Sequence, residues 1–473
     1  MGKNLTPARF ERFPVREFVL LPLSVALYAL VLHWVYVNLV TESFAYLGYR
    51  YESPVAQMVF ITWALAVAVA VLLPRRITRP SGLILWVLFV VCVGPSILMS
   101  TYVALLDPWT AIAVSAAIAA AFAGVVLWTR RPVRSLPSRL AVSGTTFWIL
   151  LGLFSLLTYG LLAFTSGLSL RYVSLLEVYS VRDEYSTALA GAGGLLGYVV
   201  STQANVINPV IIARGIYSRR PLPIILGVVG QLVIYSGTGF KTVLFSLPAV
   251  LLLALLFRRN LRPAGQMFLW GTIALMVVAA AVDELQDTNL WTSLFSRRFL
   301  FTPGLFSSAY VAFFSENPKV HLGHSILSPW FDNPYFAAPP RVIGQWLIGS
   351  ADTAANANLF ADGFANFGWW GVAGAAVVLA VYLRLLDRAA HALPAAVSAI
   401  VVFMPTVALS NSAILTAMLS HGLVVAFGVL AVAPRTGWGL QPKKDPLARR
   451  ILVRADVPAG TRDARLSAPP TAP

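Results

Sequence analysis

The sequence predicts an all-α polytopic membrane protein with about twelve transmembrane helices. The chain of 473 residues is 58% hydrophobic, and only 11% of its residues are charged. Its mean hydropathy is +0.75, whereas the surface of a soluble domain of this length would have to be mostly polar. Apolar runs close to the roughly 20 residues that cross a bilayer recur along the chain, and basic connecting segments alternate with acidic ones.

Each of these apolar runs predicts one membrane span. The runs are long and carry few charges, which is typical of transmembrane helices. No small-residue cleavage site follows the first long run, so we expect that run to remain in the protein rather than to be removed as a signal peptide. In chain order the predicted spans are 17–40, 55–73, 82–104, 109–128, 143–166, 188–212, 222–236, 241–257, 267–282, 367–386, 395–410 and 412–433.

The net charge of +16 would suit a nucleic-acid partner, but the distribution of the charge indicates membrane topology instead. With the N-terminus inside, the short inner segments are basic and the outer segments together are net acidic. This pattern is the positive-inside rule. We therefore expect both termini on the cytoplasmic side, the lipid bilayer as a partner and no nucleic acid. The basic inner segments include 75–79, 130–139, 214–220 and 258–262.

The chain is expected to form one membrane domain followed by a tail. The domain covers 1–433, and an extracytoplasmic loop with interfacial helices, 283–366, is inserted between the ninth and tenth spans. The tail, 434–473, is basic and rich in Pro without apolar periodicity, so we expect it to be disordered and cytoplasmic. A long polar loop adds no stability to a membrane protein. The functional site is therefore predicted in 283–366 and at the outer ends of the spans.

Two adjacent cations, Arg297 and Arg298, lie in this loop on the side where positive charge is otherwise scarce. Arginine forks bind phosphate oxygens in pairs and stay charged at any working pH. Residues 297–315 are apolar enough to lie in the membrane interface, and Pro303–Gly304 would turn the chain there. The two guanidinium groups would then lie at the depth of a lipid-linked diphosphate. The alternative is a pair of anchors that reach toward anionic lipid.

Three further cations on the outer side are candidates for binding an anion. Lys241 ends the segment SGTGFK, whose glycines would let backbone amides approach a phosphate. A lysine that extends to the headgroups from a helix end is the alternative. Arg182 precedes Asp183 and Glu184, so a local ion pair would explain it equally well. Arg341 is the third cation.

The segment HLGH contains His321 and His324. On a helix, two histidines three residues apart could hold a metal ion, but no third ligand of clear spacing accompanies them. A single histidine that acts as a general base or bonds to the substrate is the preferred interpretation. An ordinary interfacial histidine is the alternative. We expect no metal site and no soluble cofactor.

The segment NANLFADGFANFGWWG precedes the tenth span and contains Asn356, Asn358, Asp362 and Asn366. If a helix starts here, the last three of these share one face, because they are spaced four residues apart. A carboxylate with amide neighbours suits the activation of a sugar hydroxyl, which makes Asp362 a second candidate for the general base beside His324. Capping of the helix N-terminus is the alternative, although it explains one such residue better than four.

Several motifs that would indicate other chemistry are absent from the sequence. No DxD or ExD motif occurs in an outer segment, which argues against a metal-dependent transferase that uses a phosphate-sugar donor. No GxSxG, HExxH, CxxC or Walker motif occurs in a fitting context. Scattered charges within the spans, typical of transporters, are also few; Gln203, Asn205 and Asn208 in the sixth span are the best polar group of that kind.

The order of these motifs resembles that of the oligosaccharide repeat-unit polymerases, the Wzy-type polymerases of O-antigen and capsule synthesis. The resemblance covers about 236–372 and includes SGTGFK, RRFLFTPG with the following Tyr310, FFSENP with its histidines, and NANLFADGFANFG. Arg182 and Gly193 also match an Arg-x10-Gly spacing found in some of these polymerases.

The resemblance implies a GT-C-like glycosyltransferase in the bacterial inner membrane, with its active site facing the periplasm. Donor and acceptor would both be undecaprenyl-diphosphate-linked oligosaccharides, and a chain-length-regulating membrane protein would be a further partner. Arg297, Arg298 and Lys241 would stabilise the diphosphate leaving group, and Asp362 or His324 would activate the acceptor hydroxyl. Two alternatives stay open: a transferase like the O-antigen ligases, and a transporter or flippase of lipid-linked sugars.

Overall fold

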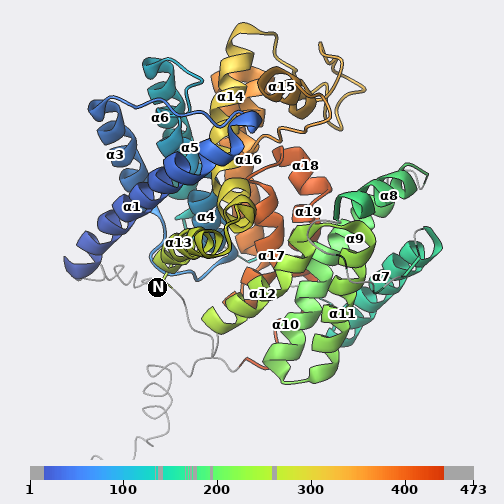
Figure 1. Cartoon of the computed structure of the whole chain (residues 1–473). Helices are drawn as coiled ribbons and strands as arrows, with labels where there is room; N and C mark the ends of the chain where they lie inside the picture. Colours follow the sequence, from blue (N-terminus) through green and yellow to red (C-terminus); the bar gives the residue numbers. More distant parts are fainter. Residues whose placement is uncertain are drawn as a thin grey trace, which may run out of the picture.

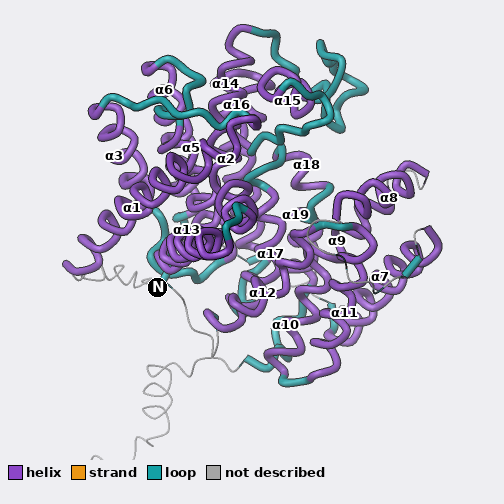
Figure 2. The backbone as a smooth tube through the Cα atoms, viewed as in Figure 1, coloured by secondary structure: helices purple, strands orange, loops and turns teal. Residues whose placement is uncertain are grey.

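The computed structural model describes residues 15–440 except 134, 137–141, 166, 169, 171–172, 174–177, 192–194 and 258–263. Every regular element in this part of the chain is helical, as Figures 1 and 2 show. The all-α prediction is confirmed. The predicted tail beyond Leu440, the whole basic segment 258–262 and Gly193 lie outside the described residues.

The first half of the chain supplies helices that lie on both flanks of the molecule (Figure 1). Short π-helical or 3-10 turns, labelled η, interrupt several of them. The elements are α1 (Val15–Val35), η1 (Tyr36–Val40), α2 (Thr41–Phe44), η2 (Ala45–Leu47), α3 (Ala56–Leu72), α4 (Pro80–Leu88), η3 (Phe89–Val93), α5 (Gly94–Met99), α6 (Pro108–Thr129), α7 (Gly144–Thr165), α8 (Val178–Gly191), α9 (Leu195–Thr202), η5 (Gln203–Ile207), α10 (Asn208–Ser218) and α11 (Pro221–Thr238).

The second half of the chain supplies most of the centre of the molecule and the part that extends beyond α5 and α6 in Figure 1. Its helices are connected by short turns, except for the segments on either side of α15. The elements are α12 (Lys241–Leu256), α13 (Gln266–Gln286), η7 (Thr292–Phe301), α14 (Thr302–Glu316), α15 (Pro339–Ile348), α16 (Leu359–Ala389), α17 (Ala395–Ala408), α18 (Ile414–Leu419) and α19 (Leu423–Val432).

By length and composition, 8 helical runs among the described residues could cross a membrane. Four shorter apolar helices, α3, α12, α17 and α19, match the second, eighth, eleventh and twelfth predicted spans. A polytopic membrane protein is therefore supported. The count of twelve spans and the orientation of the chain stay predictions.

The described residues pack around two hydrophobic cores. The larger core joins α1, α3 to α6, α13, α14, α16, α17 and α19. The smaller core joins α7, α8, α9, α11 and α12, which we call the side bundle. Figure 1 shows α7, α8 and α11 together at one flank, away from α1 and α3.

α16 is a helical hairpin rather than one straight helix. Its first leg, 359–366, is buried along its whole length, and the chain then reverses at Phe367 and Gly368. Gly368 has φ 60° and ψ −140°, a conformation that glycine alone adopts without strain. The second leg, 369–389, runs back beside the first, because a Cβ on Gly363 would lie only 2.5 Å from the carbonyl oxygen of Gly371.

The first half of the predicted outer loop belongs to the core. η7 and α14 form one continuous helical run, and α14 packs against α5 and α16 with one side fully buried. Gly304 allows this approach, since a Cβ there would lie 3.1 Å from the Pro95 carbonyl oxygen. The prediction of an interfacial segment at 297–315 is therefore wrong for α14, and so is the turn at Pro303–Gly304. Pro303 stands at the junction of η7 and α14, where its missing N–H leaves one backbone hydrogen bond of the run unmade.

The side bundle is joined internally by a buried network of amide side chains. Asn208 accepts a hydrogen bond from Gln203 at 2.7 Å and donates one to Gln231 at 3.0 Å. Gln231 in turn donates to the Ala204 carbonyl oxygen and to the Ser246 hydroxyl. Gln203 and Asn208, the residues that would favour a transporter, are therefore engaged in contacts between helices. Asn205 lies outside this network.

The beginning of the predicted tail packs against the protein. Arg435 donates hydrogen bonds to the carbonyl oxygens of Ala389, Leu430 and Ala431. The Trp438 ring is buried and lies edge-on to Trp148, with their centroids 5.5 Å apart. Disorder was expected from Arg435 onward, whereas residues up to Leu440 are anchored on α7, α16 and α19.

Candidate functional site

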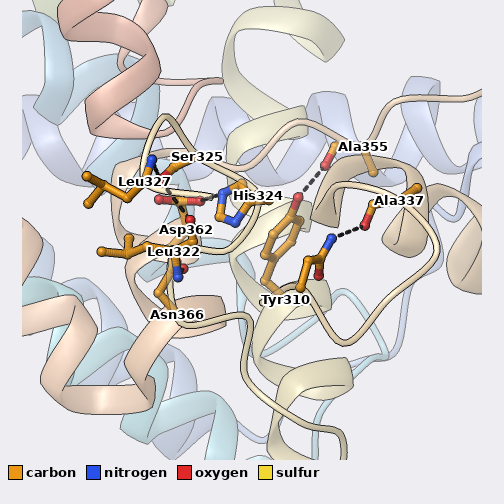
Figure 3. Close-up of polar contacts among 10 residues, drawn as sticks. Tyr310, Leu322, His324, Ser325, Leu327, Ala337, Ala355, Asp362 and Asn366 are labelled. Carbon is orange, nitrogen blue, oxygen red and sulfur yellow. Dashed lines mark hydrogen bonds and ion pairs between the residues drawn. The ribbon is translucent and has the colours of Figure 1, made fainter. Parts of the chain in front are cut away.

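A histidine–carboxylate pair forms between the loop that follows α14 and the first leg of α16. His324 Nε2 is 3.2 Å from Asp362 Oδ1, and both side chains are mostly buried, with 10% and 12% of their surfaces exposed. Asp362 is in the first turn of α16, where the helix N-terminus favours a negative charge. The pair brings together the two residues between which the choice of general base was left open. Figure 3 shows the imidazole ring turned toward the carboxylate.

The loop that carries His324 is held by the end of the same leg. The Asn366 side chain accepts a 2.6 Å hydrogen bond from Leu322 N and donates one to the Asp362 carbonyl oxygen. The loop reaches this position through left-handed backbone conformations at His321 and Leu322. At Gly323 the loop lies against the backbone of residues 332–333, and a Cβ there would collide with it. These constraints set the direction of the His324 ring.

The second ring nitrogen of His324 is unused. Nδ1 is buried and makes no hydrogen bond within the part of the chain that the structure describes. If Nε2 carries the proton that is shared with Asp362, Nδ1 holds the free lone pair. Tyr310 lies on the far side of the ring in Figure 3, and its hydroxyl donates a 2.9 Å hydrogen bond to the Ala355 carbonyl oxygen. Burial, and then the nearby charge of Asp362, raise the pKa of Tyr310.

Of the asparagine side chains predicted for the site, that of Asn366 bonds to Asp362 among the described residues, whereas Asn358 meets Asp362 through its backbone carbonyl oxygen. Asn358 is the N-cap of α16 and accepts hydrogen bonds from Phe360 N and Ala361 N. Its amide nitrogen donates to the Pro303 carbonyl oxygen and to the Ser307 hydroxyl, which fixes α16 to α14. Asn358 thus serves the fold with both ends of its side chain. Asn356 is exposed, just before the helix.

Arg297 and Arg298 lie on η7. The Arg297 guanidinium group donates to the Ser293 hydroxyl, with its Nη2 at 2.8 Å, and lies over the Phe44 ring at 4.6 Å. Arg298 is exposed in the last turn of η7. Asp283 prepares this segment by accepting hydrogen bonds from Trp291 N and Thr292 N at the start of η7. A direct role of the two arginines beside Asp362 stays a prediction.

The other predicted cations are dispersed. Arg182 donates a 3.3 Å hydrogen bond to the Gly239 carbonyl oxygen, and its guanidinium group lies 5.5 Å from the centre of the Phe240 ring. Lys241 is half-buried and begins α12, directly after that turn. Arg182 and Lys241 therefore belong to the side bundle. Arg341 is exposed on α15.

His321 and His324 do not form a metal site. They lie in a loop rather than on a helix; His321 is exposed, with its ring centre 5.6 Å from that of Phe367, whereas His324 turns inward. The one-face arrangement considered for HLGH is thus corrected. Among the residues that the structure describes, no group of three or more metal-binding side chains is found.

Lys319 is a cation that the sequence interpretation missed. Its ammonium group bonds to the Phe314 carbonyl oxygen at the end of α14 and lies 5.2 Å from the centre of the Phe364 ring on the first leg of α16. Partial burial lowers its pKa. The sequence feature that could have identified Lys319 was its position five residues before His324, on the predicted outer side, where few other cations occur.

Comparison of the chain with protein-family models, with curated proteins and with solved structures finds no match. The described residues therefore establish a helical, membrane-type fold with a buried histidine–carboxylate pair at the end of its central hairpin.

Proposed function

We propose that this protein is a membrane glycosyltransferase that polymerises oligosaccharide repeat units carried on undecaprenyl diphosphate. The observation that supports this most is the His324–Asp362 pair with its free Nδ1 atom. A carboxylate that fixes one imidazole nitrogen leaves the other as a proton acceptor, as general bases require. The pair lies in the segment that resembles the repeat-unit polymerases.

In the proposed reaction, His324 is the base and Asp362 is the positioning residue. An acceptor sugar hydroxyl attacks the anomeric carbon of the donor glycan and gives its proton to His324 Nδ1. The bond between that carbon and the diphosphate oxygen breaks, and the lipid diphosphate leaves with the bonding electrons. Asp362 stabilises the imidazolium ion that forms. This assigns different roles to two residues that the sequence presented as alternatives.

His324 Nδ1 is buried in this structure. The proposal therefore requires the loop 317–338 to move away from α16 so that the acceptor sugar can reach this nitrogen. The contacts that would have to separate join the loop to α16: Val320 N donates to the Ala365 carbonyl oxygen, and Leu322 N donates to the Asn366 side chain. The diphosphate would be met by cations on the same side of the molecule. Arg297, Arg298 and Lys319 are the candidates. The proposed location is the outer face of a bacterial inner membrane.

The test is reconstitution of purified protein with polyprenyl-diphosphate-linked repeat units, with products separated on a gel. The wild type is expected to give a ladder, and His324→Gln is expected to lose it. His321→Gln is the matched control, because it changes the same residue type in the same loop without touching the carboxylate. A single discrete transfer product would favour the ligase-like alternative. A folded wild type that gives no product from a matched substrate would overturn the proposal.

A further inference from the structure

A second polar site lies in the side bundle, away from the His324–Asp362 pair. It is a cavity of about 450 Å³ between α8, α9, α12 and the turn that joins α18 to α19. We call it the side cavity. Its polar and aromatic lining residues are Tyr185, Tyr198, Ser201, Asn205, Phe240, Thr242, Ser420 and His421.

The side cavity contains hydrogen-bonding groups that the fold does not use. The Asn205 amide nitrogen donates to the Ser201 hydroxyl and to the His421 carbonyl oxygen, at 3.2 and 3.4 Å. Within the described residues, the Asn205 amide oxygen, the His421 ring and the hydroxyls of Thr242 and Ser420 have no hydrogen-bond partner. Unused polar groups beside a cavity are costly unless water or a ligand meets them. The side cavity is therefore suited to a polar occupant.

The lining distinguishes between a phosphate and a sugar. Apart from the His421 ring, no ionisable cation or carboxylate lines the cavity. Arg182 on α8 is held by the Gly239 carbonyl oxygen and by the Phe240 ring, and Lys241, between Phe240 and Thr242 in the chain, is not among the lining residues. A phosphate would leave its charge uncompensated there. Amide, hydroxyl and imidazole groups beside aromatic faces match the hydroxyls and the C–H face of a sugar ring.

An apolar groove adjoins the side cavity. The groove has a volume of about 240 Å³ and lies between η3, α12, α13, η7 and α17; Thr242 lines both it and the side cavity. Its walls are almost entirely apolar and rich in aromatic rings, including Phe245, Phe295, Phe299 and Phe403. A molecule with a neutral polar head and a long hydrocarbon chain would fill the two spaces together. An isolated sugar would leave the groove empty, and a simple lipid would leave the polar groups unmet.

We propose that the side cavity binds the sugar head of a glycolipid, with the lipid chain in the adjoining groove. Asn205 and His421 bond the sugar hydroxyls, and Tyr198 and Phe240 provide the aromatic walls. The binding of this glycolipid does not rest on the proposed function, whose substrates carry a diphosphate that the lining of the side cavity does not suit.

The test measures binding without turnover. Cys92 is the only cysteine and is buried, so a cysteine introduced as Ser420→Cys can be labelled selectively with N-ethylmaleimide in nanodiscs. Octyl β-D-glucoside and octyl β-D-galactoside are the probes, compared with octanol and octyl phosphate. At ten times its dissociation constant, a bound glycoside is expected to slow labelling about tenfold. Asn205→Ala and His421→Ala in the same background are expected to remove this protection.

Thr272→Cys, in the wall of the apolar groove, is the matched control. Octanol and the glycosides should protect it equally, since only the chain reaches it. If Ser420→Cys does not fold, Ser201→Cys takes its place, because Ser201 lines the side cavity and not the groove. Equal protection of the side cavity by octanol or octyl phosphate would overturn the proposal, and so would absence of protection by both glycosides. Protection by a glycoside together with no ladder in the polymerisation assay would keep the glycolipid site and reject the polymerase.

Discussion

The two polar sites of this protein differ in how much of their hydrogen-bonding capacity the fold itself uses. Around Asp362, the His324 ring is bonded to the carboxylate and the Asn366 side chain to nearby backbone, and the surrounding helices belong to the larger core. Around Asn205 and His421, several polar groups have no partner among the described residues, and the site lies between helices of the smaller core and the turn from α18 to α19. The polar groups of the first site are already held in place by the fold, whereas those of the second site are available to bond a ligand.

This difference in hydrogen bonding fits the two proposed roles, with a reaction at the first site and ligand binding at the second. A base must be held within hydrogen-bond reach and in one direction, which needs a rigid support. A binding cavity gains affinity from groups that exchange water for ligand, so these groups have to be free in the empty state. The prediction is that changes at the first site affect rate and stability strongly, whereas changes at the second affect ligand binding and leave stability nearly unchanged.

The largest expected effect is on the rate of Asp362→Asn. Loss of the carboxylate removes the group that fixes the His324 ring and stabilises the imidazolium ion formed in the proposed reaction, so polymerisation is expected to slow by about 10²- to 10⁴-fold. Initial rates of ladder formation measure this. Asp332→Asn is the control, because Asp332 is an exposed carboxylate in the loop that carries His324. Equal activity of Asp362→Asn and the wild type would remove Asp362 from the mechanism.

Gly363→Val is the next largest change and acts on the support of the first site. The added side chain would collide with the Gly371 carbonyl oxygen of the second leg, which we expect to cost about 3 kcal/mol of stability. Thermal unfolding in detergent measures the loss. Gly374→Val is the matched control on the same helix, since nothing lies within 4 Å of a Cβ at Gly374. Similar unfolding temperatures for the two variants would contradict the hairpin packing.

Gln231→Leu breaks the amide network of the side bundle. Asn208 would lose an acceptor, and the Ala204 carbonyl oxygen would lose its side-chain donor, at a cost of about 1–3 kcal/mol. Asn205→Leu, whose amide lies outside the network at the wall of the side cavity, should cost clearly less. Denaturation of both variants under one condition provides the comparison. A larger loss for Asn205→Leu would reverse the assignment of structural and binding amides.

The smallest expected effect comes from Ser420→Ala. Its hydroxyl has no hydrogen-bond partner among the described residues, so the stability change is expected to stay within about 0.5 kcal/mol. Ser307→Ala is the contrasting variant, because that buried hydroxyl bonds to Ser96 and Asn358 between three helices. We expect Ser307→Ala to lower stability by about 1–2 kcal/mol. Equal losses would mean that the two sites do not differ in how they are held.

The helices were the most predictable part of the structure. Each predicted span coincides with an apolar helix or helical run among the described residues, because burial in lipid or core demands a long apolar segment. The helix start at Asn358 was also visible, since the four-residue spacing to Asp362 and Asn366 and the capping preference of asparagine act locally. α14 was missed because it is buried by small residues such as Gly304 and Ser307 rather than by continuous hydropathy.

The pairing of the site residues could be only half predicted. His324 and Asp362 were both named, but the bond between them depends on a loop with two left-handed residues, which no local pattern in HLGH indicates. Asn358 was expected to meet substrate and instead joins α14 to α16. Arg297 was expected beside a diphosphate and packs on Phe44. In each case the deciding partner is distant in sequence, and charge or spacing alone does not reveal it.

The hairpin in α16 ties the position of the Asp362 carboxylate to the thickness of the bilayer. Asp362 lies one tight turn from a long apolar leg, and Gly363 against Gly371 prevents the two legs from sliding independently. At its far end the same leg is fixed to α4, because Asp387 accepts hydrogen bonds from Ser81. A thinner or thicker membrane that tilts this leg therefore shifts Asp362 relative to the loop that holds His324. We therefore expect the length of the lipid chains to change the distance and orientation between His324 and Asp362.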